Sequence, residues 1–87
     1  MINMARWKCR KLSGPWVQCD SKTYKAQATV FESPSKYGIN NGRISKLWVQ
    51  RKSDKKEILN YDRGWDIKPK NVRSFIKPFL DYRKTKR

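Results

Sequence analysis

Asp62 and Asp66 form a carboxylate pair that could do chemistry. They lie in the segment Tyr61-Asp62-Arg63-Gly64-Trp65-Asp66, and two such groups could bind Mg²⁺ in a nuclease. A structural role is the stronger interpretation, because Arg63 stands between the two acids and Asp62 could brace a turn. The chain also contains no histidine, which removes the commonest general base. We therefore expect no enzyme activity and no catalytic residues.

The sequence predicts neither a metal site nor a cofactor. Two cysteines, Cys9 and Cys19, cannot make a structural zinc site alone, and the common phosphate-binding and nucleophile motifs are absent. Ser13-Gly14-Pro15 between the cysteines predicts a hairpin turn. A two-residue loop would place Cys9 opposite Gln18, whereas a three-residue loop would place it opposite Cys19. In a reducing cytosol we expect two free, partly buried thiols.

Positive charge dominates the composition. The 87 residues include 22 Lys and Arg against 7 Asp and Glu, which gives a net charge of +15. Such an excess repels itself in the folded state, so a polyanion such as DNA, RNA or a nucleoprotein is the expected partner. The longest apolar run is far shorter than the roughly 20 residues that cross a bilayer. The first residues lack the apolar region of a signal peptide, so we expect a cytoplasmic protein without membrane contact.

Alternating polar and apolar residues predict an antiparallel sheet. Ala26, Ala28 and Val30 fall on one side of a strand, and the small alanines would let another element pack closely. In the following strand Ile44 and Trp48 share a face with Lys46, while Leu47 and Val49 point the other way. The expected strands cover about residues 5–12, 15–19, 23–32, 43–51 and 57–61.

A C-terminal helix is expected to cover one face of this sheet. Its apolar residues recur at helical spacing: Val72, Phe75, Ile76, Phe79 and Leu80. The predicted helix covers about residues 69–84, and Pro78 should kink or break it. The fold class is therefore α+β, a single domain over residues 1–87. It has a sheet of four or five strands at about residues 5–66 with the helix packed on one face.

The aromatic residues divide between the core and the surface. In so short a chain we assign to the core Trp7, Trp48, Trp65, Phe75 and Phe79. The residues left as candidate stacking platforms for bases are Trp16, Tyr37 and Tyr82.

Three groups of cations could bind anions. Arg6, Lys8 and Arg10 on one strand would form a patch with Lys25 if those strands pair. The turn at residues 40–42 could offer backbone N–H groups beside a cation, although it could equally be a plain loop tip. Arg63 could act as a fixed bidentate fork, held by an unusual backbone conformation at Gly64. The candidate binding residues are Arg6, Lys8, Arg10, Lys25, Arg43, Lys46, Arg63, Arg73 and Lys77.

Two segments carry a family resemblance. Residues 35–48, which read SKYGINNGRISKLW, and residues 61–66, which read YDRGWD, resemble a family of small uncharacterised proteins of bacteriophages and prophages. The resemblance implies a phage accessory protein inside a bacterial host. Phage proteins of this size often act by binding, and some inhibit host defence systems such as CRISPR nucleases. With its positive charge, this chain would have to grip nucleic acid, a guide–nuclease complex or an acidic protein surface.

These observations lead to one preferred function and two alternatives. The preferred function is non-enzymatic binding of nucleic acid or a host nucleoprotein through a basic surface, in the manner of an anti-CRISPR inhibitor. One alternative is an inhibitor that docks directly on a host defence protein. The other is a sponge for small phosphorylated signals, which would use Arg43 and Arg63 as anion grips.

Overall fold

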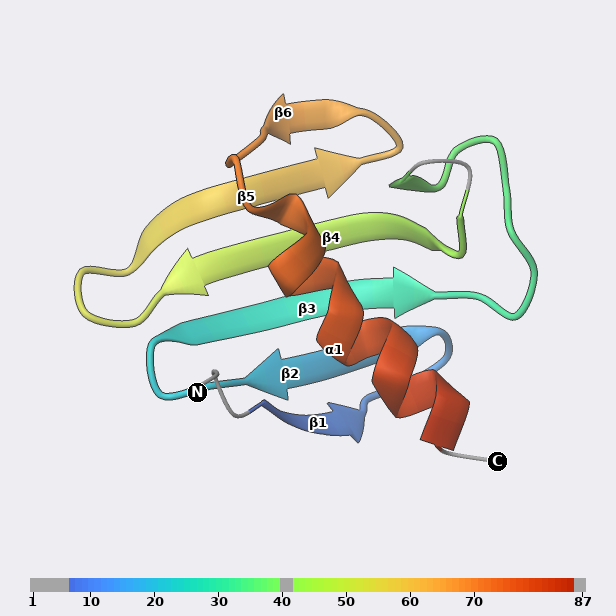
Figure 1. The fold of residues 1–87 in the computed structure, drawn as a ribbon, viewed down its shortest axis with the longest axis horizontal. Helices are drawn as coiled ribbons and strands as arrows, with labels where there is room; N and C mark the ends of the chain where they lie inside the picture. Colours follow the sequence, from blue (N-terminus) through green and yellow to red (C-terminus); the bar gives the residue numbers. More distant parts are fainter. Residues whose placement is uncertain (1–6, 40–41, 86–87) are drawn as a thin grey trace.

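One helix packs against one face of a six-stranded antiparallel sheet in a computed structural model of the chain, which describes residues 7–39 and 42–85 (Figure 1). The strands lie side by side in chain order, each hydrogen-bonded to the next. The elements are β1 (Lys8–Lys11), β2 (Trp16–Asp20), β3 (Tyr24–Val30), β4 (Ile44–Arg51), β5 (Lys56–Asp62), β6 (Trp65–Ile67) and α1 (Val72–Thr85).

The α+β class and the packing of a C-terminal helix on one face are confirmed, but the expected four or five strands are too few. The missed strand is β6, where the sequence predicted only a rigid corner after β5. It has three residues and follows a two-residue turn, so it is too short to show an alternating pattern.

The core lies between α1 and the central strands. Phe75 and Phe79 are 2% and 0% exposed, and α1 contacts β1, β2 and β3. Ala26 and Ala28 of β3 are fully buried beneath the helix side of the sheet, where their small side chains leave room for α1. Burying each phenylalanine contributes about 1.5–3 kcal/mol, so this contact is the main attachment of the helix.

A β-bulge at the start of β4 changes the predicted facing of its residues. Val30 pairs with Ile44, whereas the preceding Thr29 pairs with Lys46, so Ser45 is an extra residue in the ladder. The bulge turns Ile44 into the core with Leu47, and the prediction that Ile44 shares the face of Lys46 is wrong.

Helix α1 begins three residues later than predicted and continues through Pro78, so of the two expected outcomes, a kink or a break, the break is wrong. The carbonyl of Asn71 accepts hydrogen bonds from the backbone N–H of Ser74 at 3.2 Å and from its hydroxyl at 2.8 Å, which marks the first turn. Pro78 has no N–H to donate to the Ser74 carbonyl. Ser74 is exposed, so a water molecule can donate a hydrogen bond to its carbonyl in place of the missing N–H. The contacts on the buried side of the helix do not depend on that bond.

The segment between β3 and β4 folds back on itself and adds to the core. Phe31 N–H donates to the Arg43 carbonyl at 2.9 Å, and Ser35 N–H donates to the Gly42 carbonyl at 2.9 Å. A side chain on Gly38 would collide with that same carbonyl, so this close approach requires glycine. Ile39 at the tip is only 6% exposed, and this anchors the segment to the helix side of the sheet.

The β4–β5 turn is closed by an ion pair. Arg51 donates two hydrogen bonds to the Asp54 carboxylate, at 3.1 and 2.9 Å, and the N–H of Lys56 donates a third at 3.2 Å. These bonds, of which the one from Arg51 has the largest effect, lower the pKa of Asp54 to about 2. Lys55 completes the turn with a φ of 58°.

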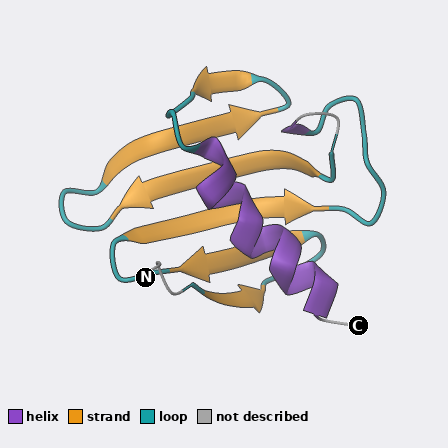
Figure 2. Ribbon diagram, viewed as in Figure 1, coloured by secondary structure: helices purple, strands orange, loops and turns teal. Residues whose placement is uncertain are grey.

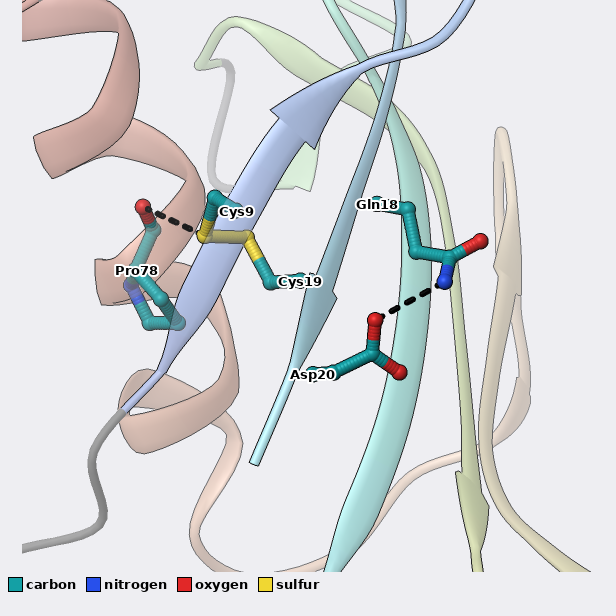
Figure 3. Close-up of a disulfide and its surroundings, with 5 residues drawn as sticks. All are labelled: Cys9, Gln18, Cys19, Asp20 and Pro78. Atoms are coloured by element: carbon teal, nitrogen blue, oxygen red, sulfur yellow. Dashed lines mark hydrogen bonds between the residues drawn. A yellow bond between two sulfur atoms is a disulfide. The ribbon is translucent and has the colours of Figure 1, made fainter. Parts of the chain in front are cut away.

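Cys9 and Cys19 form a disulfide, so the prediction of two free thiols is wrong. The β1–β2 hairpin has the three-residue loop, because Leu12 N–H donates to the Trp16 carbonyl, and this register places Cys9 opposite Cys19. The bond lies on the helix side of the sheet, with Cys9 Sγ 3.8 Å from the carbonyl oxygen of Pro78 (Figure 3). It therefore ties the edge strand β1 to β2 next to the helix.

Replacing Cys19 with serine should destabilise the oxidised protein by about 2–3 kcal/mol, because the bond closes a short loop in the unfolded chain. Urea unfolding with and without reductant measures the effect. Wild-type protein should lose the same amount of stability on reduction, and the Cys19→Ser variant should be insensitive to reductant. A wild-type midpoint that does not move on reduction would contradict the disulfide.

Candidate functional site

The face of the sheet opposite α1 is not covered by any element of the described chain (Figure 2). We call it the open face. Strand register and alternation place on it the residues Lys8, Arg10, Trp16, Gln18, Asp20, Lys25, Gln27, Thr29, Lys46, Trp48, Gln50, Glu57, Asn60 and Asp62. Cations, amides and two tryptophans therefore occupy one continuous surface.

A row of amide side chains crosses the centre of the open face. Gln27 Nε2 donates to Gln18 Oε1 at 2.9 Å, and Gln18 Nε2 donates to Asp20 Oδ2 at 2.8 Å. Figure 3 shows the Gln18–Asp20 pair on the side of β2 opposite the disulfide. The register continues this row from Gln27 to Trp48 and then to Asn60. These hydrogen bonds hold the amide side chains of Gln18 and Gln27 in fixed positions.

Trp16 and Trp48 belong to the open face rather than to the core. Both indoles are partly exposed, and neither is part of the buried cluster, so the prediction that Trp48 is a core residue is wrong. Gln18 and Thr29 on the same face are only 8% and 4% exposed. The Thr29 hydroxyl lies 3.2 Å from the Ser45 hydroxyl. In the register Trp16 lies opposite Thr29, and Trp48 lies opposite Gln27.

The strands of the predicted patch of Arg6, Lys8, Arg10 and Lys25 do not pair with each other, which was the condition for that patch. β1 and β3 both pair with β2, so Lys8 and Lys25 flank Asp20 in one cross-strand row. Lys46 lies farther along β4, opposite Asp62.

The open face as a whole carries four cations, Lys8, Arg10, Lys25 and Lys46, against three carboxylates, Asp20, Glu57 and Asp62. Two of these carboxylates are already paired with other cations, Asp20 with Lys52 at 3.8 Å and Asp62 with Arg63 at 3.3 Å.

Arg43, Arg73 and Lys77 lie on the helix side of the sheet. They line a groove of about 640 Å³ between α1 and the end of the β3–β4 segment. The structure thus divides the predicted cations between two surfaces. Arg6 lies outside the described residues, as do Asn40 and Asn41 of the predicted anion-binding turn.

Arg63 borders the open face, beside Asp62 and in a cavity with Ser45, whose hydroxyl lies 3.2 Å from that of Thr29. The side-chain Nε of Arg63 lies 3.3 Å from Asp62 Oδ1, and its backbone N–H donates to the Ser45 carbonyl at 2.9 Å. The unusual backbone conformation expected at Gly64 occurs at Arg63 instead, which has a left-handed φ of 59°. Arg63 lines a cavity of about 530 Å³ with Phe31 and Tyr37, separate from the groove that contains Arg43. The two arginines of the sponge hypothesis therefore do not share a pocket.

The prediction that Trp65 is a core residue is also wrong, because Trp65 is 37% exposed. Its ring meets Tyr61 edge to face at 4.9 Å between centroids, and Lys68 Nζ lies 5.4 Å from its centroid. Of the predicted platforms, Tyr37 is 52% exposed, whereas Tyr82 packs against the core. Lys68, Trp48 and the glutamine row are the functional candidates that sequence reasoning missed.

Asp62 is engaged by Arg63, as the structural interpretation of this acid expects. Among the residues that the structure describes, no three side chains of the types that bind metals come together.

Residues 15–81 match the family described as Domain of unknown function (DUF7678). Neither the curated proteins nor the solved structures contain a match to the chain. Within the described part of the chain, no helix has the length and apolar character needed to span a bilayer.

Truncating Trp48 should leave the fold intact, since its ring lies outside the core. We expect Trp48→Ala to cost about 1 kcal/mol of stability, in line with the loss of a large side chain from a strand surface. The matched Phe79→Ala should cost about 3–5 kcal/mol, because Phe79 is fully buried. Urea unfolding of both variants measures the difference. Equal losses would place Trp48 in the core and contradict the open face.

Proposed function

We propose a nucleic-acid-binding function for this chain, which belongs to the family described as a domain of unknown function (DUF7678). The proposed ligand is an unpaired stretch of DNA or RNA, free or within a host nucleoprotein. The proposed interface is the open face. The observation that carries the proposal is the presence of Trp16 and Trp48, outside the core, on a sheet face that no described element covers.

Stacking on the tryptophans is the first element of the proposed interaction. Every base has a flat face, and stacking on an aromatic side chain contributes about 1–3 kcal/mol per base. Bases within a duplex have their faces covered by neighbouring pairs, so only unpaired bases can use these rings. The amides of Gln27 and Asn60, in the same cross-strand row as Trp48, would contact the base edges.

Charge is the second element. Lys8, Arg10, Lys25 and Lys46 would contact phosphates around the two rings, as nucleic-acid backbones require. The net charge of +15 would draw a polyanion to the protein from a distance and raise the rate of encounter. The three carboxylates of the open face limit the purely electrostatic contribution, which favours a ligand that also stacks.

The biological setting is proposed from the family resemblance described for residues 35–48 and 61–66. We propose a phage accessory protein, without enzyme activity, that acts in the cytoplasm of the bacterial host against a nucleic-acid-guided defence system. In that reducing compartment Cys9 and Cys19 would form a dithiol for much of the time. The thiol of Cys9 could then donate a hydrogen bond to the nearby Pro78 carbonyl, which the disulfide sulfur cannot do.

Binding of a fluorescent single-stranded oligonucleotide, followed by anisotropy over a range of salt concentrations, tests the proposal. With four phosphate contacts we expect a slope of log K against log salt of about −3. Lys25→Gln should make this slope shallower by about 0.7. The matched Lys70→Gln, which removes the same charge just before α1, should leave the slope unchanged.

A separate variant, Trp48→Ala, tests the stacking contribution. Trp48→Ala should weaken binding about 5- to 150-fold and leave the salt slope unchanged, because it removes a ring and no charge. A duplex of the same sequence should bind more weakly than the single strand. Equal affinity for duplex and single strand, together with an unchanged affinity of Trp48→Ala, would refute the open face as the interface.

A further inference from the structure

The groove on the helix side is a second surface with its own chemistry. One wall is α1, and the other comes from Ile39, Gly42 and Arg43 at the end of the β3–β4 segment. Trp65 and Lys68 also line the groove. Its volume of about 640 Å³ is within the range of roughly 300–1,000 Å³ that is usual for binding clefts.

The wall that α1 gives the groove has an apolar stripe. Val72, Ile76 and Leu80 recur every four residues along one face of α1, which covers about 12 Å of its length. Ile76 and Leu80 pack against the core and remain partly exposed. A ligand that fills this groove must therefore bring apolar groups, spaced to match two or three turns of a helix.

The rim of the groove is cationic. Arg43, Lys68, Arg73 and Lys77 all line it, and the one carboxylate that does so is Asp81. Asp81 forms an ion pair with Lys77, with an Nζ–Oδ2 distance of 2.9 Å. The ion pairs found among the described residues do not involve Arg43, Lys68 or Arg73. The rim is thus complementary to a ligand that carries several negative charges.

We propose that the groove binds an acidic segment of a partner protein, which inserts apolar side chains along α1 and places carboxylates against Arg43, Lys68 and Arg73. A protein segment can supply apolar and anionic groups in alternation at this spacing. A nucleic-acid strand fits less well, because its phosphates would lie over Ile76 and Leu80. The face of Trp65 that a base would need is approached by Lys68.

This interaction is separate from the proposed nucleic-acid binding. The groove is built on α1, whereas the open face lies on the opposite side of the sheet (Figure 1). Both ligands could therefore bind at once, which suits a protein that recognises the two components of a nucleoprotein.

A labelled amphipathic peptide tests the groove directly. The probe is a peptide of about 15 residues with leucine on one helical face and glutamate elsewhere, titrated with the full-length protein and followed by anisotropy. Its control is a shuffled peptide of identical composition with no apolar face. We expect binding of the first peptide and at least tenfold weaker binding of the second. Equal affinities would mean attraction by charge alone, and no binding of either peptide would also overturn the proposal.

Charge-neutralising variants separate the two surfaces. Arg73→Gln and Lys68→Gln should each weaken peptide binding about two- to fivefold, as expected for exposed ion pairs, and leave oligonucleotide binding unchanged. The matched Lys25→Gln on the open face should weaken oligonucleotide binding and leave peptide binding unchanged.

Competition between an oligonucleotide and the peptide tests which of them the groove binds. An unlabelled single-stranded oligonucleotide should not displace the peptide. Displacement, or loss of oligonucleotide affinity in Arg73→Gln, would assign the groove to nucleic acid and refute the acidic protein segment. If instead the oligonucleotide fails to bind at all while the peptide binds as expected, the groove proposal is supported and the proposed nucleic-acid binding is refuted.

Discussion

The packing of a single helix on one face of the sheet is the constraint on which the rest of the structure depends. Phe75 and Phe79 are buried between α1 and the small side chains Ala26 and Ala28 of β3. One helix can cover only one side, so no element of the described chain packs over the other side. The open face, with its two tryptophans, is a direct consequence of this arrangement.

The same arrangement divides the positive charge. Alternation along β1, β3 and β4 sends Lys8, Lys25 and Lys46 to the open face, while the register of α1 sends Arg73 and Lys77 to the groove. The two surfaces differ in what accompanies the cations. Amides and partly exposed indoles surround them on the open face, and aliphatic side chains lie between them in the groove. Different partners are expected for surfaces of such different chemistry.

The sequence predicted the elements that have a regular pattern. The helix was found from the spacing of Val72, Phe75 and Phe79, and the inward alanines of β3 from simple alternation. It could not predict which face of a strand becomes the core once a bulge intervenes, as at Ser45. It also could not assign Trp48 and Trp65, because tryptophan at a sheet surface and tryptophan in a core follow the same period. The disulfide was missed because the free thiols were predicted from an assumed reducing cytosol, while Ser13-Gly14-Pro15 left open the loop length that sets the cysteine register.

Mapping backbone amide shifts by NMR during titration with a single-stranded oligonucleotide tests the central claim most directly. The account predicts that shifts concentrate on β2, β3 and β4, with the indole N–H signals of Trp16 and Trp48 among the largest, and that α1 is little affected. Shifts centred on α1 and the groove, with the two indole signals unmoved, would contradict it.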